Sequence, residues 1–465
     1  MPNFSRIVIG ATHSGAGKTT VAAALMAALT AAGLTVQPFK VGPDYIDPGY
    51  HTAATGRVCR NLDPWLMGED GVRECFRRAA HDADISVIEG VMGLFDGQAD
   101  TGTGSTAQVA RLLSAPVLLV VDARSLARSA AALVRGYRDF EPGLDLGGVI
   151  LNRTGSERHR ALLLRAVQGE AGLPVIGALG REDEVSLPER HLGLLPAVER
   201  GGLDGFVERL AGLGRQLDLQ AVVRLAASAP GPPMPSRAVF PAEPMPPAVR
   251  LGVARDQAFN FYYQDSLDLL RALGAELVEV SPVSGTLDPG LDGIYLGGGF
   301  PEVFAGEIAA NGEFMRVLRT LYDGGLPVYA ECGGLMYLGR SLRGPDGAVH
   351  PMAGLLAGET VMERRRAALG YVTATVLTGN LLAPAGTILT GHEFHYSTYR
   401  GERPGCPAYR VSGAAAPDGR LEGVAGPHLL ASYVHLHFVS CPDSARAFLN
   451  AANRYRLARE GGLAP

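Results

Sequence analysis

The sequence is poor in cysteine, and its cysteines form no recognisable pair. Five occur in 465 residues, without a CxxC motif and without the spacing of a metal site. This argues against a zinc-ribbon protein or a disulfide framework, and reduced thiols in a cytoplasmic protein are the simplest expectation. No motif surrounds Cys59, Cys75, Cys406 or Cys441, so we interpret these four as structural.

The sequence also lacks a membrane-spanning run, a secretion signal and an excess of basic residues. The uncharged stretch 19–36 is alanine-rich, contains glycine and threonine, and is expected to form a buried helix. The N-terminus does not have the basic, apolar and cleavable segments of a signal peptide. The net charge is −5 at pH 7, unlike the basic footprint of a nucleic-acid-binding protein. We expect neither a membrane nor nucleic acid as the partner.

Proline is concentrated in one segment that predicts a domain boundary. Residues 228–247 hold eight prolines in twenty positions, a density that disfavours helix and central strand and favours an extended chain. We therefore expect a domain over 1–227, a linker over 228–247, a second domain over 248–455 and a tail over 456–465. No internal repeat is visible.

Short apolar runs alternate with helical periodicity on both sides of this segment, which is typical of α/β domains with a largely parallel sheet. In the first half the expected strands are 6–11, 35–41, 85–90, 116–123, 146–152 and 173–179. In the second half they are 250–254, 276–280, 293–298 and 327–331, with further short strands after residue 350. Open α/β sheets bind ligands at the carboxyl ends of their strands, so binding motifs are expected there.

A phosphate-binding loop follows the first strand. The segment THSGAGKTT ends like the GxxxxGK[ST] loop, although Thr12 replaces its first glycine. Backbone N–H groups and the next helix N-terminus can cradle phosphates, Lys18 can reach the β- and γ-phosphates, and the Thr19 hydroxyl can bind Mg²⁺. The alternative is a plain glycine-rich turn. The expected ATP-binding residues are Thr12, Ser14, Gly15, Ala16, Gly17, Lys18, Thr19 and Thr20, with Asn152 as a reader of adenine or as an ordinary strand-end residue.

Charged residues gather at neighbouring strand ends. Glu89 closes the strand 85–90, Asp96 lies on the loop behind it, and the segment KVGPDYIDPGYH follows the strand 35–41. We expect a synthetase site made of Lys40, Asp44, Tyr45, Asp47, Glu89 and Asp96. Thr19, Glu89 and Asp47 are the expected Mg²⁺ ligands. The alternative is that Asp44 and Asp47 only shape turns around the prolines.

These motifs resemble the synthetase half of the corrin a,c-diamide synthases. The residues that carry the resemblance are the deviant phosphate loop, KVGPDYIDPGYH and IEGVMGLFDG. The resemblance implies a dethiobiotin-synthetase-like P-loop domain. Partition ATPases share the wider fold, but they have a signature lysine where this chain has His13.

A second motif, AECGG, follows the strand 327–331. A strand, a sharp turn and a helix form a nucleophile elbow, which presents Cys332 at a helix N-terminus and lowers the pKa of its thiol. The motif resembles the elbow of class I, or triad, glutamine amidotransferases, with Ala330 in place of the first glycine. The alternative is that Cys332 is a buried structural thiol.

A base and an oxyanion hole are expected from elsewhere in the chain. The segment 431–438, ASYVHLHF, is expected to be one strand with His435 and His437 on the same face. The resemblance implies that His435 is the base for Cys332. Other triad amidotransferases have a glutamate where this chain has His437, so whether a third residue orients His435 is left open. The turn YLGGGFPE resembles the family's oxyanion turn, and the expected donors are Gly298, Gly299 and Gly333.

Two further segments are expected to be structural. GHEFHYSTY contains His392, Glu393 and His395, but its spacing is not HExxH, and His392 and Glu393 face opposite ways on a strand. Packing is therefore favoured over a metal site. The aromatic residues of 255–267 are expected in the core or an interface.

The phosphate-loop motif and the cysteine-elbow motif together predict an ATP-dependent ligase. ATP would activate a carboxylate as an acyl phosphate, and Cys332 would release NH₃ from L-glutamine. The resemblance implies amidation of the c and then the a side chain of cobyrinic or hydrogenobyrinic acid. Alternatives are a related tetrapyrrole such as nickel sirohydrochlorin, a dethiobiotin-synthetase-like ligase with an inert second half, and a switch ATPase with a protein partner. A homodimer is the candidate assembly.

Overall fold

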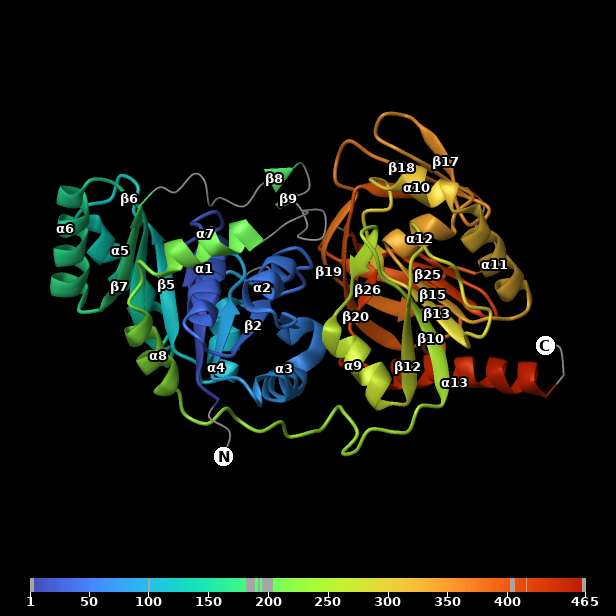
Figure 1. The fold of residues 1–465 in the computed structure, drawn as a ribbon, viewed down its shortest axis with the longest axis horizontal. Helices are drawn as coiled ribbons and strands as arrows, with labels where there is room; N and C mark the ends of the chain where they lie inside the picture. The colour runs from blue at the N-terminus through green and yellow to red at the C-terminus, as the bar shows by residue number, and fades with distance from the viewer. Residues whose placement is uncertain are drawn as a thin grey trace. The chain divides into compact units, whose positions relative to one another are not determined.

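The computed structural model describes residues 4–98, 101–180, 189–190, 193–194, 204–401, 406–414 and 416–461. Its contacts divide the chain into two units, Met1–Ala238 and Val239–Pro465, and the division falls inside the proline-rich segment (Figure 1).

The proline-rich segment forms hydrogen bonds with the first unit around residue 236 and with the second unit around residues 245–248. The backbone N–H groups of Ser236 and Arg237 donate to the carboxylate of Asp70 in the first unit, at 2.9 and 3.1 Å. The N–H groups of Met245 and Ala248 donate to carbonyls at the end of a helix in the second unit, at 2.9 and 2.8 Å. These bonds explain why the division falls between residues 238 and 239.

A seven-stranded sheet forms the centre of the first unit (Figure 1), and its strand order is β3-β2-β4-β1-β5-β6-β7. All its neighbouring strands are parallel. The strands are β1 (Arg6–Ala11), β2 (Val36–Val41), β3 (Arg60–Leu62), β4 (Ile85–Glu89), β5 (Val117–Asp122), β6 (Leu146–Thr154) and β7 (Val175–Gly180). A two-residue pair, β8 (Glu189–Arg190) and β9 (Gly193–Leu194), is separate from it. Six of the seven strands coincide with the apolar runs of the sequence.

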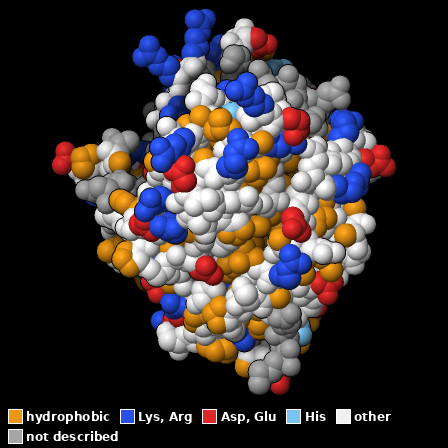
Figure 2. Space-filling model, turned by 90° about the vertical axis from the view of Figure 1, so that its left-hand side faces the viewer, with side chains coloured by type: hydrophobic (Ala, Val, Ile, Leu, Met, Phe, Trp, Pro, Cys, Tyr) orange, Lys and Arg blue, Asp and Glu red, His pale blue; other side chains and the backbone are white. Residues whose placement is uncertain are grey.

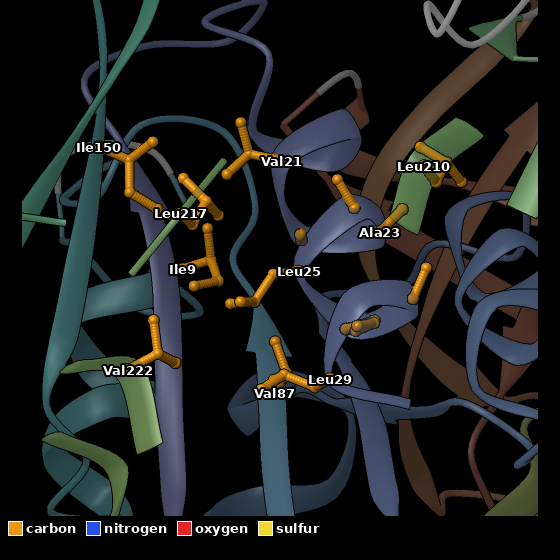
Figure 3. Close-up of a cluster of buried hydrophobic side chains, with 14 of the residues drawn as sticks. Ile9, Val21, Ala23, Leu25, Leu29, Val87, Ile150, Leu210, Leu217 and Val222 are labelled. Atoms are coloured by element: carbon orange, nitrogen blue, oxygen red, sulfur yellow. The ribbon is translucent and has the colours of Figure 1, made fainter. Parts of the chain in front are cut away.

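Helices pack on this sheet. They are α1 (Lys18–Ala31), α2 (Asp47–Thr55), α3 (Pro64–Ala80), α4 (Thr106–Leu112), α5 (Ser129–Phe140), α6 (Glu157–Ala166), the π-helix η1 (Val167–Ala171), α7 (Asp204–Gly214) and α8 (Leu219–Ala227). Every residue of α1 from 21 to 29 is buried. Figure 3 shows that α1 is covered on two sides. Leu25 faces the sheet near Ile9, and Leu210 of α7 lies beside Ala23. The small alanine side chains let α7 approach α1 closely.

The second unit has a six-stranded sheet in the order β12-β10-β13-β15-β25-β24, parallel except for β24. Its strands are β10 (Val249–Ala254), β12 (Ala275–Val280), β13 (Gly293–Leu296), β15 (Val328–Glu331), β24 (Val424–Ala425) and β25 (Leu429–Ser432). The helices are α9 (Gln264–Ala272), α10 (Ala305–Ala310), α11 (Gly312–Asp323), α12 (Gly333–Leu338) and α13 (Pro442–Glu460). The tail expected from residue 456 is thus helical as far as Glu460, because Arg459 bonds to Leu291 and Asp292.

Further β-structure surrounds this second sheet. A five-stranded antiparallel sheet has the order β23-β22-β19-β20-β26, a four-stranded sheet has the order β17-β16-β18-β21, and β11 pairs with β14. The strands are β11 (Phe259–Phe261), β14 (Gly298–Gly299), β16 (Ser341–Arg343), β17 (Val349–Pro351), β18 (Glu359–Met362), β19 (Ala368–Val376), β20 (Ile388–His395), β21 (Ser397–Arg400), β22 (Tyr409–Gly413), β23 (Ala416–Glu422) and β26 (His435–Leu436).

The single strand predicted over 431–438 is wrong. β25 ends at Ser432 in the six-stranded sheet, and β26 begins at His435 in the five-stranded sheet, where it pairs with β20. The Ser432 hydroxyl accepts a bond from the Val434 N–H at 3.0 Å, which turns the chain between the sheets.

Figure 2 shows cationic and anionic side chains interspersed on one face of the molecule, in keeping with the small net charge. Within the described part of the chain, no helix combines the length and the apolar character that crossing a bilayer requires.

Candidate active sites

The phosphate loop lies between β1 and α1, and its backbone has the shape that phosphate binding needs. Gly15 and Gly17 have φ values of 83° and 90°, a region that favours glycine. A Cβ atom at Gly17 would lie 2.2 Å from the Asn152 side-chain nitrogen. Asn152 Nδ2 donates to the Ala16 carbonyl at 2.9 Å, so Asn152 fixes the loop. This contact does not test its predicted role in reading adenine.

Other residues hold the start of the loop at Thr12. The Thr12 N–H donates to the Val120 carbonyl of β5 at 3.1 Å, and the Thr12 carbonyl accepts a bond from the Tyr137 hydroxyl. Ser14 is exposed, and Thr20 is half-buried in the first turn of α1. The loop before α1 is therefore fixed at Thr12 and, through Asn152, at Ala16.

Predicted residues from four elements meet beside this loop. The Thr19 hydroxyl donates to Glu89 Oε1 at 2.6 Å and to Asp47 Oδ2 at 3.3 Å. Lys18 Nζ lies 3.2 Å from Glu89. Lys40 Nζ lies 2.6 Å from Asp47 and 3.0 Å from Glu89. The strand ends of β2 and β4 thus bring Lys40 and Glu89 to the start of α1.

Lys18 and Lys40 are the only two lysines among the 42 basic Lys and Arg residues of the sequence. Burial and the charge of Lys40 lower the pKa of Lys18. Burial would also lower the pKa of Lys40, but Asp47 and then Glu89 raise it. For Glu89, Lys40 and Lys18 outweigh burial and lower the pKa well below its usual range. Both lysines are therefore held against one ionised carboxylate.

Three other predicted residues lie around this cluster. Asp44 Oδ1 accepts the N–H groups of Ile46 and residue 47 at 2.8 and 3.2 Å, and its carboxylate is 3.9 Å from Lys40. Asp44 thus shapes the turn and also forms an ion pair with Lys40. Tyr45 lies half-buried in the same loop. Asp96 Oδ2 accepts the Gly93 N–H of its own loop at 3.0 Å.

His51 is a member of the cluster that sequence reasoning missed. Its Nε2 atom donates to Glu89 Oε2 at 2.5 Å, and its side chain is fully buried. The sequence signal is the position of His51 four residues after Asp47, which places both side chains on one face of α2. Glu89 therefore uses one oxygen for His51 and the other for Thr19 and the lysines.

The predicted Mg²⁺ ligands form a set that fits this ion. The set offers one hydroxyl oxygen, from Thr19, and carboxylate oxygens of Asp47 and Glu89 that lie within hydrogen-bonding distance of it. Mg²⁺ is commonly held by one or two carboxylates together with phosphate oxygens and water. No group of three or more His, Cys, Asp and Glu that could hold a metal occurs anywhere among the described residues, in this cluster or in the His392–His395 segment.

Cys332 forms a sharp elbow between β15 and α12. Its φ of 46° and ψ of −100° are strained for a side chain other than glycine, and such strain gathers at functional sites. Gly334 lets the elbow close, because a Cβ atom there would lie 2.2 Å from the Leu296 carbonyl of β13. The thiol is 5% exposed among apolar side chains, so burial alone would match the structural alternative.

The surroundings of Cys332 distinguish it from a structural thiol. His435 is hydrogen-bonded to Cys332. Burial would lower the pKa of His435, but Cys332 and then Glu331 raise it to about 10. A Cβ atom at Gly298 would lie 2.5 Å from His435 Cε1, and one at Gly333 would lie 3.0 Å from the Gly299 nitrogen. The base and the predicted oxyanion glycines therefore surround one thiol.

Glu331 is the second residue that sequence reasoning missed. Its Oε2 lies 3.7 Å from His435 Nδ1, and both side chains are buried. Its only signal in the sequence is its place directly before the cysteine. The other candidate, His437, stacks on Tyr263 with ring centroids 4.6 Å apart, and burial lowers its pKa to about 3.

The remaining histidines of this region have structural contacts. The His392 ring lies 4.9 Å from the His435 ring and bonds to the Tyr263 hydroxyl at 2.8 Å. Glu393 pairs with Arg420, and His395 stacks on a tyrosine.

Comparison with known proteins assigns a family to each part of the chain. Residues 7–195 match the CobQ/CobB/MinD/ParA nucleotide binding domain, and residues 250–442 match the CobB/CobQ-like glutamine amidotransferase domain. The chain is 46% identical to a cobyrinate a,c-diamide synthase of Priestia megaterium, with 94% of each chain covered. It is 47% identical to the enzyme of that name from Gloeobacter violaceus, covering 95% of this chain and 96% of the relative.

The chain belongs to the cobyrinate a,c-diamide synthase family. A further relative, 45% identical over 96% of each chain, is a hydrogenobyrinate a,c-diamide synthase of Streptomyces coelicolor. Membership of the cobyrinate a,c-diamide synthase family confirms the predicted resemblance and fold class, and makes the protein a glutamine-dependent, amide-forming ligase with a nucleotide-binding domain.

Proposed function

We propose that the protein amidates the a and c carboxylates of cobyrinic or hydrogenobyrinic acid, with ATP, Mg²⁺ and L-glutamine as co-reactants. The observation that carries the proposal is a strained cysteine hydrogen-bonded to a buried histidine, in a chain whose other unit has a phosphate loop. The names of the relatives support the corrin acid as the substrate. Related tetrapyrroles are the alternative substrates.

The thiol site would release ammonia. Cys332 gives its proton to His435 and attacks the side-chain amide carbon of glutamine, and the N–H groups of the Gly298–Gly299 turn stabilise the oxyanion. His435 then gives the proton to the leaving nitrogen, so that NH₃ departs and a thioester remains. Water hydrolyses the thioester to glutamate and restores the thiol.

The phosphate site would activate the acid. Transfer of the γ-phosphoryl group of ATP to a corrin carboxylate gives ADP and an acyl phosphate, and NH₃ then displaces phosphate to form the amide. Lys18 and the loop N–H groups hold the phosphates, while Thr19, Asp47 and Glu89 would hold Mg²⁺. When bound, Mg²⁺ neutralises charge on the phosphate oxygens. Lys40 would balance the charge of Asp47 and Glu89.

The test is to separate the two nitrogen sources in one variant. We expect Cys332→Ser to lose glutamine-dependent amidation and to retain amidation when ammonium salts are supplied at high pH. The products are counted by mass spectrometry, and two carboxyl-to-carboxamide conversions identify the a,c-diamide branch. Glutamine use by Cys332→Ser equal to that of the wild type would refute the mechanism.

Two further predictions, of the cellular location and of the oligomeric state, belong to the same proposal. We expect a cytoplasmic protein, which cell fractionation checks, and a homodimer, which light scattering on the purified protein checks.

A further inference from the structure

Glu331 carries a buried carboxylate beside the thiol site, and the mechanism above does not use it. The residue is 1% exposed and ends β15, directly before Cys332. A buried carboxylate needs hydrogen-bond donors or an opposite charge, because an unpaired charge inside a protein is costly. The structure supplies both kinds of partner.

Three donors fix the position of this carboxylate. The Tyr295 hydroxyl donates to Oε2 at 2.9 Å, the Tyr329 hydroxyl donates to Oε1, and the Leu436 N–H donates to Oε1 at 3.0 Å. The two tyrosine rings stack with centroids 4.9 Å apart, on the neighbouring strands β13 and β15. Burial and the charge of Glu331 raise the pKa values of both tyrosines, so their hydroxyls stay protonated donors.

The same carboxylate faces the imidazole ring. Its Oε2 atom lies 3.7 Å from His435 Nδ1. Its Oε1 atom accepts the N–H group of Leu436, the residue that directly follows His435. Catalytic hydrogen bonds are often long before substrate binds. Because Glu331 lies on the Nδ1 side, Nε2 is left for Cys332.

The sequence position where related amidotransferases have an acid does not supply this contact. His437 accepts the Val439 N–H at its Nδ1 atom at 3.3 Å and stacks on Tyr263. It is a neutral ring turned to other partners. The acid that orients His435 must therefore come from another part of the chain.

We propose that Glu331 is the positioning residue of the glutaminase site, which holds His435 with a proton on Nδ1 and stabilises the imidazolium formed when Cys332 loses its proton. The proposal rests on the proposed glutaminase function. The thiol proton moves to Nε2, Nδ1 keeps its own proton toward Glu331, and the Nε2 proton later goes to the departing nitrogen. The orienting acid thus comes from the residue before the nucleophile.

The main test compares Glu331→Gln with the wild type in two measurements. In glutamine hydrolysis we expect kcat to fall by at least about tenfold with little change in KM, because the base is misoriented while the glutamine contacts remain. In alkylation by iodoacetamide we expect the rise in the rate at Cys332 to move to higher pH, because a less stable imidazolium stabilises the thiolate less. Amidation supported by ammonium salts is expected to stay unchanged.

The matched control is Glu393→Gln. Glu393 is also a buried carboxylate, 3% exposed, but it lies in β20 of the five-stranded sheet and pairs with Arg420 of β23. We expect this variant to keep the wild-type kcat and alkylation profile. A shift of equal size in both variants would mean that losing any buried carboxylate has this effect, and it would overturn the proposal.

A conservative variant covers failure of Glu331→Gln to fold. Glu331→Asp keeps the charge but withdraws it by one methylene, so we expect an intermediate kcat and an intermediate alkylation profile. Wild-type kcat and an unshifted profile in whichever variant folds would overturn the inference. If the wild type itself hydrolyses no glutamine, the proposed function fails instead, so the two failures can be told apart.

Discussion

At the scale of single residues, Lys18 and Lys40 carry the same group in different surroundings. The Lys18 side chain is 11% exposed, and burial followed by the charge of Lys40 lowers its pKa. The Lys40 side chain is 3% exposed, and its carboxylate partners raise its pKa. An amine reacts with acylating reagents only when it is neutral and accessible. Lys18 should therefore be much the more reactive of the two.

Because the chain has only these two lysines, an amine-reactive reagent is in effect directed to the phosphate site. We predict that acylation at neutral pH modifies Lys18 before Lys40, abolishes ATP-dependent amidation and leaves glutamine hydrolysis intact. MgATP should slow both the modification and the loss of activity. Peptide mass spectrometry locates the label and separates it from reaction at the N-terminal amine.

The control for this labelling is Lys18→Arg, which keeps the charge and removes the reactive amine. It should show little acylation at position 18. Faster labelling of Lys40 than of Lys18 in the wild type, or no protection by MgATP, would contradict the assignment of Lys18 to the phosphates.

The residues that sequence analysis found and those it missed differ in how their roles arise. The candidates Lys18, Thr19 and Cys332 stand in local motifs, where the loop and the elbow need only neighbouring residues. The roles of His51 and Glu331 depend on contacts across the fold, with Glu89 and with His435. Such contacts cannot be predicted from residue spacing, because they depend on which strands lie next to one another in the sheets.

At the scale of elements, the elbow depends on close packing of α12 against β13. The helix begins directly after Cys332, and Gly334 sits over the Leu296 carbonyl, where a Cβ atom would lie 2.2 Å from that oxygen. The Leu296 carbonyl belongs to the backbone, and the position of a Cβ atom is fixed by the backbone, so no rotamer change can relieve the contact. The position of the thiol is thus tied to one glycine.

We predict that Gly334→Ala destabilises the protein by about 1–3 kcal/mol, as overpacking of a well-packed core does. Denaturant unfolding followed by circular dichroism measures the change. It should also lower glutamine hydrolysis, because the helix must move away from β13. The matched control is Gly306→Ala in α10, where no atom lies within 4 Å of an added Cβ, and where the change should be neutral or stabilise by up to about 1 kcal/mol. Equal stability of the two variants would refute the packing argument.

The elements themselves could be predicted where burial is complete. Ten apolar runs in the sequence correspond to strands of the two central sheets. Most of these strands are buried on both faces and so need apolar residues on both, whereas the edge strands β7 and β12 are only partly buried. The break between β25 and β26 was missed, because the alternation in ASYVHLHF continues through it. Only pairing with β20, a partner distant in sequence, shows that His435 has entered another sheet.

At the scale of the whole molecule, the two activities reside in separate units of one chain. The phosphate cluster lies within residues 1–238 and the thiol site within 239–465. Removing the essential residue of one site should therefore leave the chemistry of the other. Lys18→Ala should still hydrolyse glutamine, and Cys332→Ser should still use ammonium salts.

A mixture of these two variants tests whether one chain must contain both sites. Ammonia made by Lys18→Ala must then cross bulk water to reach Cys332→Ser, where it is diluted and, at neutral pH, mostly converted to ammonium, which has no free electron pair. With glutamine as the nitrogen source, we predict that the mixture forms amide at less than about a tenth of the wild-type rate, since covalent linkage provides a high effective concentration. Raising the pH should recover part of the difference, because a larger fraction of the ammonia is then neutral. Product counted by mass spectrometry gives the rates, and each variant alone provides the baseline. A mixture that matches the wild type at neutral pH would show that free ammonia suffices and that joining the units in one chain has no kinetic role.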